Sequence, residues 1–183
     1  MCLQETKLDK IDLQLVRSLW GNSHVGWEML PANGIAGGVL LLWDRRVLER
    51  LDLVVCQFSV FSLWNSLADD MEWVGTGLYV PTADGLRHEM WDELRGVHQK
   101  WGLPWCVFGD FNVVHFPSER RGCTRLTPHM MDFSDFIEES HLVDLPLGGG
   151  QYTWCSGSGN PSMSRIDRFL ISADWEDRYP DAS

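Results

Sequence analysis

The sequence predicts an α/β fold in which two packed β-sheets are covered by helices. Strand-like runs, either alternating or wholly apolar, follow one another in the first half of the chain with few helices between them. Two longer stretches with helical periodicity come later, so the pattern differs from the regular βαβα alternation of a doubly wound sheet. Stacking two sheets and covering them with helices lets every amphipathic element bury its apolar face.

The first half of the chain is expected to contain one short helix and four strands. Residues 10–20 are predicted to be helical because Ile11, Leu15 and Leu19 recur every four residues, and Gly21 is a suitable end. A turn is expected at residues 31–34, where Pro, Asn and Gly gather. Apolar or alternating residues predict strands at residues 25–30, 38–43, 51–63 and 72–80.

The second half is expected to contain two helices and two clear strands. The first helix, over residues 86–101, has an expected apolar face made of Met90, Leu94, Val97 and Trp101. Pro128 suits the first turn of a second helix that extends to about residue 140. The expected apolar side of that helix consists of Met131, Phe133, Phe136 and Ile137. Strands are predicted at residues 104–109 and 165–172, and residues 148–162 are read as a loop with a strand-like stretch at 151–154.

Composition and charge exclude some classes of protein. The chain has 183 residues, of which 15 are Lys or Arg and 26 are Asp or Glu, so its formal charge is −11. This charge argues against nucleic-acid binding through a broad basic surface, although it is compatible with an acidic metal site that contacts nucleic acid locally. Since 44% of the residues are hydrophobic and no repeat or linker is visible, residues 1–183 are expected to form a single domain.

Cysteines and apolar segments favour a soluble intracellular protein. The five cysteines form no C-x-x-C pair, so a zinc site is not expected. Cys56 and Cys106 lie in apolar strand-like runs that predict buried, reduced thiols. The N-terminal residues do not resemble a secretory signal, and the longest apolar stretch, residues 51–64, is too short and polar to span a membrane. The nucleus and the cytoplasm are both compatible locations.

The strongest candidate site lies in the run from Cys106 to Asn112. An apolar strand ends there, and Asp110 and Asn112 are two residues apart, so both side chains lie on one face if the chain stays extended past Gly109. A carboxylate beside a carboxamide can bind a hard cation or orient a water molecule against a phosphate. Taken alone, the pair is more typical of a turn at the end of a strand.

Three further polar residues follow or begin strand-like runs. Glu5 could bind Mg²⁺, although a solvated acid is the simpler reading of that residue alone. Tyr79 could donate a hydrogen bond to a phosphoryl oxygen, with core or rim packing as the alternative. Asp167 lies between Arg165 and Arg168, which suggests a surface ion pair as its alternative role. Strand ends can bring such residues together at one rim of a sandwich.

Five short motifs follow one another along the chain. They are Leu3-Gln4-Glu5-Thr6-Lys7, Tyr79 before Pro81, Gly109-Asp110-Phe111-Asn112, Tyr152-Thr153-Trp154 and Ser164-Arg165-Ile166-Asp167-Arg168-Phe169. Their order resembles the endonuclease/exonuclease/phosphatase family. The likeness is greatest to the endonuclease-like domain of plant non-LTR (LINE-type) retroelements, and it extends over nearly the whole chain. The run at residues 116–122 and the stretch 133–150 also look like that branch.

The resemblance implies a four-layer α/β/β/α sandwich of two mixed sheets and phosphodiester cleavage that depends on Mg²⁺, with Mn²⁺ as a substitute. By the same resemblance, Glu5 corresponds to the metal-binding glutamate and Tyr79 to a tyrosine that contacts phosphate. Asp110 corresponds to the aspartate that activates water, and Asn112 to an asparagine that holds the phosphate. Asp167 corresponds to the aspartate that orients a catalytic histidine.

Two elements of the family pattern have no counterpart in the sequence, which predicts a domain truncated at both ends and an incomplete sandwich. A first strand with an Asn-containing motif should precede the Leu-Gln-Glu strand, and a Ser-Asp-His motif should follow the Arg-Ile-Asp strand. Of the six histidines, only His115 lies near Asp110 in sequence, and a histidine at the rim is the preferred reading of it. Loss of the catalytic histidine would impair turnover. Missing strands would also leave sheet edges unpaired.

These observations leave functions of different classes open. The leading hypothesis is a Mg²⁺-dependent phosphodiester hydrolase that acts on DNA, without a small-molecule cofactor or a membrane partner. The alternative is a non-catalytic, retroelement-derived remnant that binds nucleic acid or protein weakly. A phosphatase acting on a small substrate such as a phosphoinositide could use the same metal site. Target sequence and oligomeric state are not determined by these patterns.

Overall fold

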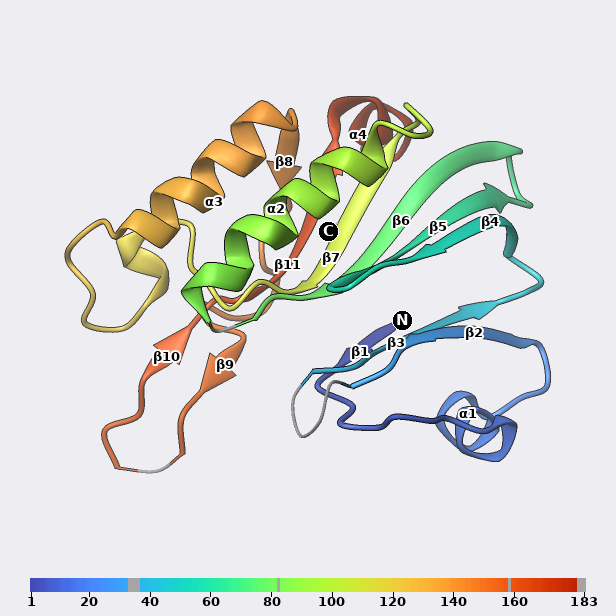
Figure 1. The fold of residues 1–183 in the computed structure, drawn as a ribbon, viewed down its shortest axis with the longest axis horizontal. Helices are drawn as coiled ribbons and strands as arrows, with labels where there is room; N and C mark the ends of the chain where they lie inside the picture. Colours follow the sequence, from blue (N-terminus) through green and yellow to red (C-terminus); the bar gives the residue numbers. More distant parts are fainter. Residues whose placement is uncertain (33–36, 82, 158, 181–183) are drawn as a thin grey trace.

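Four layers of secondary structure make up the fold in the computed structural model, which describes residues 1–32, 37–81, 83–157 and 159–180. Helices α2 (Asp84–His98) and α3 (Pro128–Glu139) cover one face of a six-stranded sheet. A three-stranded sheet packs on the other face, and helix α1 (Leu13–Trp20) lies outside it (Figure 1). The predicted α/β/β/α layering is therefore confirmed.

The six-stranded sheet has the strand order β4-β5-β6-β7-β11-β8. Only β6 and β7 are parallel, because α2 provides the crossover connection that parallel neighbours need, and the other pairs are antiparallel. The bounds are β4 Leu48–Val55, β5 Ser59–Ser66, β6 Met71–Tyr79, β7 Trp105–Asp110, β8 Leu142–Asp144 and β11 Asp167–Ser172.

The single strand predicted at residues 51–63 is wrong, because the chain forms the β4–β5 hairpin there. The turn has no Gly or Pro to mark it. It is stabilised from a distance by the Glu93 carboxylate on α2, which accepts hydrogen bonds from the backbone N–H groups of Gln57 (2.9 Å) and Phe58 (3.2 Å). Cys56 is consequently half-buried next to the turn and does not lie within a strand, whereas Cys106 is buried in β7 as expected.

The three-stranded sheet has the antiparallel order β1-β3-β2, with β1 Cys2–Gln4, β2 Val25–Leu30 and β3 Val39–Asp44. Alternation along β3 explains its position between two layers. Leu40 and Leu42 pack with Val16 of α1, whereas Val39 and Leu41 pack with Val60 of the six-stranded sheet. The strand is consequently buried on both faces.

Strand β1 pairs with β3 on one side and forms an edge of its sheet. Beside it lies an apolar cleft of about 390 Å³, lined on the six-stranded sheet by Phe108 and Phe169. Phe169 is 55% exposed.

Two helices turn faces toward the core that differ from the predicted ones. In α1 the buried residue is Val16, which packs with Leu40 and Leu42, while Leu15 and Leu19 are exposed. Asp12 caps the helix and accepts from the Leu15 N–H at 2.8 Å. In α3 the buried position is Met130 and not Met131, which is 52% exposed. Met130, Phe133 and Ile137 follow the helical spacing of three and four residues.

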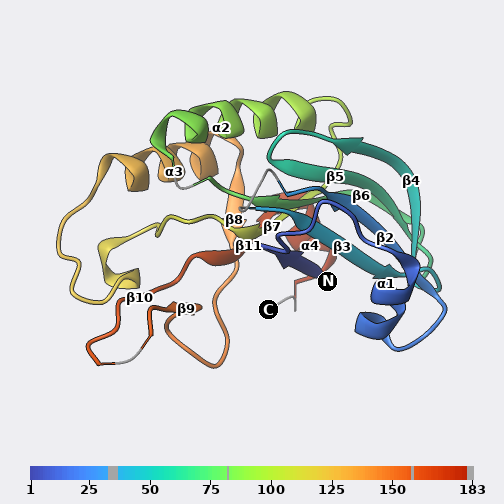
Figure 2. The same ribbon diagram turned by 60° about the horizontal axis from the view of Figure 1, so that its bottom comes forward.

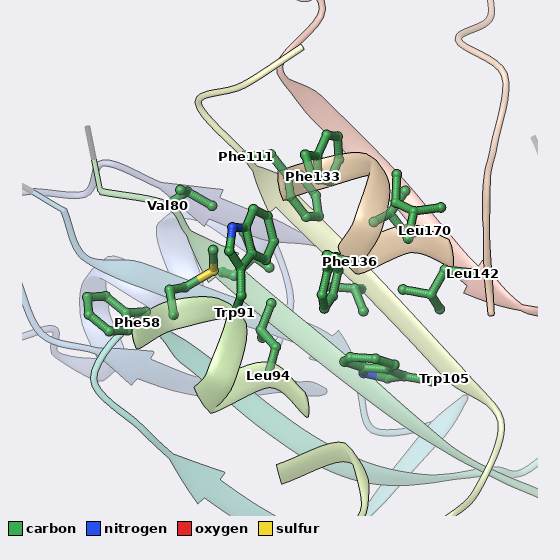
Figure 3. Packing of buried hydrophobic residues seen from close by; sticks show 14 of the residues in the cluster. Phe58, Val80, Trp91, Leu94, Trp105, Phe111, Phe133, Phe136, Leu142 and Leu170 are labelled. Carbon is green, nitrogen blue, oxygen red and sulfur yellow. The ribbon is translucent and has the colours of Figure 1, made fainter. Parts of the chain in front are cut away.

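The main core lies between the six-stranded sheet and helices α2 and α3 (Figure 3). Trp91 of α2 stacks on Phe136 of α3, with ring centroids 4.6 Å apart, and also packs on Phe111 and Phe133. Trp105 at the start of β7 is fully buried, and its indole N–H donates to Thr76 Oγ1 at 2.8 Å. Aromatic stacking therefore fixes both helices to the strand that ends at Asp110.

Several short elements have no clear sequence pattern. They are β8, the single 3₁₀ turn Pro117–Glu119, and α4 (Ala173–Arg178). The glycine-rich loop contains a small hairpin, β9 (Trp154–Cys155) paired with β10 (Met163–Ser164), so the strand-like stretch expected at 151–154 is displaced (Figure 2). The turn expected at residues 31–34 lies partly outside the described residues.

Replacing Phe133 by Ala should lower the free energy of unfolding by about 3–5 kcal/mol, because it opens a cavity in the aromatic core. Phe169→Ala is the matched control, and the exposure of this side chain limits the expected loss to less than about 1 kcal/mol. Urea denaturation of both variants measures the difference. Equal losses would contradict the burial pattern.

Candidate active site

Three of the predicted residues form one row across the six-stranded sheet. Tyr79 at the end of β6 is the parallel register partner of Asp110 at the end of β7. Asp167 at the start of β11 is the antiparallel partner of Asp110. Adjacent strands thus place Tyr79, Asp110 and Asp167, called the site row below, side by side at one end of the sheet.

Gly109 makes this row possible. Its φ of 147° lies in the region that glycine tolerates best, and a Cβ at this position would lie 2.2 Å from the Leu78 carbonyl oxygen. A side chain here would push β7 away from β6. The glycine therefore allows the close approach that aligns Tyr79 with Asp110.

Asp110 and Asn112 converge through a turn and not through an extended strand. Strand β7 ends at Asp110, and Asn112 adopts a left-handed φ of 48°. The Asn112 N–H donates to Asp110 Oδ1 (2.8 Å), and its side-chain Nδ2 donates to the Val80 carbonyl oxygen (2.7 Å). The extended geometry considered from the sequence is wrong, yet the turn brings both residues to the same pocket.

Glu5 reaches the site row from the other sheet. It follows β1 with a left-handed φ of 53°, and its carboxylate accepts a hydrogen bond from the Tyr79 hydroxyl. Lys7 Nζ lies 3.6 Å from Glu5 Oε2 on the solvent side. Glu5 therefore lies next to the ends of β6 and β7, although it directly follows a strand of the three-stranded sheet.

A pocket of about 530 Å³ lies at this end of the fold. Glu5, Tyr79, Asp110 and Asn112 line it, and Asp167 is adjacent through its pairing with Asp110. The structure thus brings all five candidate residues together. The remaining lining residues were not predicted. They are called the hairpin wall below because they lie in or beside the β9–β10 hairpin, and they are Arg120, Trp154, Ser162, Ser164 and Ile166.

Burial and like charges dominate the electrostatics of the pocket. Burial is the main reason that the pKa of Asp110 is raised to about 6. The negative charges of Asp167 and Glu5 act in the same direction, and the hydrogen bond from the Asn112 N–H opposes the shift. Burial also raises the pKa of Tyr79 to about 12, with the hydrogen bond to Glu5 as the next cause. Tyr79 consequently stays protonated and can donate a hydrogen bond at neutral pH.

The surface ion pair considered for Asp167 is not formed by its flanking arginines. Arg168 is 3% exposed and pairs with Glu119 and Asp144, and Arg165 Nη2 lies 2.8 Å from Asp144 Oδ1. Thr153 Oγ1 accepts from the Asp167 N–H at 3.0 Å. Because Arg165 and Arg168 pair with Glu119 and Asp144, neither of them neutralises the Asp167 carboxylate, which can act on Asp110.

His115 takes no part in the pocket. Its ring stacks on Phe116 with centroids 3.9 Å apart, and its Nδ1 lies 3.9 Å from Asp144 Oδ2 in the arginine cluster. Among the residues that the structure describes, no histidine lines the pocket. The reading of His115 as a local substitute for a catalytic histidine therefore has no support.

The donor set is suited to a weakly chelated hard cation. No three His, Cys, Asp or Glu side chains of the described residues are grouped tightly enough to hold a metal ion by themselves. Mg²⁺ commonly uses only one or two carboxylates and completes its shell with water and substrate oxygens. Burial and the charges of Asp167 and Glu5 raise the pKa of Asp110, so a cation bound beside these acids would favour its ionised form. Glu5 and Asp110 thus fit Mg²⁺ in chemical type.

The sequence profile of the endonuclease/exonuclease/phosphatase family matches residues 1–182. The chain belongs to this family. No curated protein matches the chain significantly. The expected membership is confirmed, and the order of motifs read from the sequence corresponds to the site built above.

Solved structures share the fold at low sequence identity. The endonuclease domain of TRAS1, a telomere-specific non-LTR retrotransposon, has a TM-score of 0.63 and 16% identity, covering 86% of this chain and 71% of that one. The human Nocturnin catalytic domain with bound sulfate has a TM-score of 0.60 and 16% identity, covering 94% and 68%. D. rerio TDP2 complexed with single-strand DNA product has a TM-score of 0.57 and 15% identity, covering 93% and 69%.

No helix in the described ranges is long and apolar enough to cross a membrane.

Asp110→Asn should stabilise the fold, because it removes a charge that the pocket disfavours while keeping an oxygen that accepts from Asn112. Asp110 has a folded-state pKa raised from 3.8 to about 6, so its contribution to stability is complete below pH 3.8 and is lost as pH rises through about 6. At pH 8 in EDTA we expect a gain of roughly 1–3 kcal/mol, which vanishes near pH 4.

Urea unfolding at both pH values measures this gain, and Asp135→Asn on the exposed side of α3 is the control, expected to show no such pattern. An Asp110→Asn protein no more stable than wild type at pH 8 would contradict the electrostatic account.

Proposed function

We propose that the protein is a Mg²⁺-dependent phosphodiester hydrolase that cleaves DNA slowly. The observation that carries this proposal is the site row of Tyr79, Asp110 and Asp167, joined by Glu5 in one pocket. Two hydrogen-bond donors and several carboxylates face a common space there. This combination suits the binding of a phosphate and the activation of water against it.

Asp110 is proposed as the general base that takes a proton from the attacking water. A pKa near 6 leaves its carboxylate ionised at neutral pH while keeping it more basic than an ordinary aspartate. Tyr79 is proposed to donate its hydroxyl proton to a phosphoryl oxygen, and Asn112 to hold the phosphate through its amide. To take these roles, the Tyr79 hydroxyl must exchange its hydrogen bond to Glu5 for one to the phosphate. The Asn112 amide must likewise exchange its hydrogen bond to the Val80 carbonyl oxygen.

Glu5 is proposed to hold Mg²⁺, with Mn²⁺ as a functional substitute. When bound, the ion supplies positive charge that offsets the charge developing on the phosphate and the leaving oxygen. Glu5 also orients Tyr79 by accepting its hydroxyl hydrogen bond. This carboxylate thus connects the metal site to the phosphate site.

Slow turnover is proposed because no histidine lines the described pocket. The role that the resemblance implies for Asp167, orienting a catalytic histidine, has no partner there. We propose instead that Asp167 acts through Asp110, whose proton affinity its negative charge raises. Absence of one general acid–base partner commonly lowers a rate by a factor of about 10²–10⁴.

DNA is proposed as the substrate because of the likeness to a retrotransposon endonuclease and to TDP2 complexed with a DNA product. The retroelement branch suggested by residues 116–122 supports the same choice. A non-catalytic nucleic-acid-binding protein is the second candidate, and the lack of a histidine in the pocket is the observation that favours it.

Plasmid nicking tests the proposal. With Mg²⁺ the wild-type protein should nick supercoiled DNA slowly, EDTA should stop the reaction, and Asp110→Ala should lower the rate by about 10² or more because the base is lost. Asp135→Ala, a change on the exposed surface of α3, should keep the wild-type rate. Nicking that persists in Asp110→Ala would refute the assignment, and DNA binding without any nicking would favour the second candidate.

A further inference from the structure

Arg120 is the one cationic side chain on the pocket lining within the described residues. Its guanidinium is held in place, because its Nε donates to Ser164 Oγ at 3.1 Å and Ser164 is only 2% exposed. Its backbone is also fixed by a β-bridge to Ser164 and by its N–H donating to the Pro117 carbonyl oxygen at 3.1 Å. The side chain is therefore oriented by the hairpin wall before any ligand binds.

The charge of Arg120 has no carboxylate partner within 4 Å among the described residues. Its neighbours behave differently, since Arg165 and Arg168 each pair with both Glu119 and Asp144. The two terminal nitrogens of the Arg120 guanidinium remain available, and their planar fork matches two oxygens of a phosphate.

The two walls of the pocket offer two separate binding surfaces. Tyr79 and Asn112 belong to the sheet wall, where the proposed function places the reacting phosphate. Arg120 and Trp154 belong to the hairpin wall, and Trp154 is 45% exposed. An aromatic face beside a fixed guanidinium suits a sugar or base next to a second phosphate. A small monoester would fill the sheet wall and leave Arg120 without a ligand.

We propose that Arg120 binds the phosphate next to the reacting one, so that the site selects a polynucleotide strand over small phosphoesters. This inference rests on the proposed function, and it names the second phosphate as the part of the substrate that the same pocket recognises. Trp154 provides the surface against which the intervening nucleoside lies. Arg120 thus determines specificity and takes no part in bond cleavage.

A comparison of two substrates tests the role of Arg120 during turnover. The ratio of kcat/KM for a short DNA oligonucleotide to kcat/KM for bis(p-nitrophenyl) phosphate should fall about tenfold in Arg120→Gln, mainly through KM for the oligonucleotide. Arg121→Gln is the matched control, because Arg121 is exposed, adjacent in sequence and absent from the pocket lining. It should leave the ratio at the wild-type value. An unchanged ratio in Arg120→Gln would overturn the proposal.

A binding measurement separates this proposal from the proposed function. In the Asp110→Asn background with Mg²⁺, fluorescence anisotropy of a labelled oligonucleotide should show about tenfold weaker binding when Arg120→Gln is added. The slope of log K against log salt should fall by about one, as for loss of one phosphate contact. Adding Arg121→Gln should change neither. If wild type hydrolyses neither substrate, the proposed function fails, and equal binding with and without Arg120 would overturn the present inference.

Discussion

Strands β6 and β7 approach so closely at Gly109 that a Cβ there would lie 2.2 Å from the Leu78 carbonyl oxygen. The parallel register of these strands sets Tyr79 beside Asp110, and the antiparallel register with β11 adds Asp167 on the other side. The turn at Asn112 and the reach of Glu5 across the sandwich both depend on this arrangement. A single residue without a side chain thus determines whether the polar groups meet.

Gathering carboxylates at one end of a sheet costs stability, and other parts of the fold offset that cost. The aromatic core beneath α2 and α3 anchors β7 through Trp105 and the ring cluster around Trp91. On the same side of the molecule, Arg168 is buried against Phe133 and is neutralised by two acids. Removing one partner of such a buried network is far more costly than losing a surface pair. The rigid framework therefore allows a strained, negatively charged pocket to persist.

Much of the architecture follows from local patterns. Strand β2 has the predicted bounds, and the helix that begins at Pro128 and the strand that ends near Gly109 differ by one or two residues. The five candidate residues could be chosen because their motifs occur in the order of the family. Their meeting in one pocket depends on strand register, which no local pattern contains.

The remaining errors share a physical cause, which is contact between residues far apart in sequence. The β4–β5 turn depends on Glu93, some 35 residues away. The partners of Arg165 and Arg168 are Glu119 and Asp144, so the ion pair considered as the alternative role of Asp167 does not form with these arginines. The buried face of α1 is set at Val16, which packs with Leu40 and Leu42 of β3. Arg120 and Trp154 lie within motifs of the resemblance, but only the fold places them in the same pocket as Glu5 and Asp110.

The most direct test of the site is a ¹³C NMR titration of the Asp110 carboxyl carbon with and without Mg²⁺. Without the ion, the pKa should be about 6 because of burial and the charges of Asp167 and Glu5. With Mg²⁺ the pKa should fall by about one unit or more, since a nearby cation favours the ionised form. The decrease should be much smaller in Glu5→Gln. A pKa close to 3.8 that does not respond to Mg²⁺ would contradict the proposal that this pocket is a metal-assisted phosphodiesterase centre.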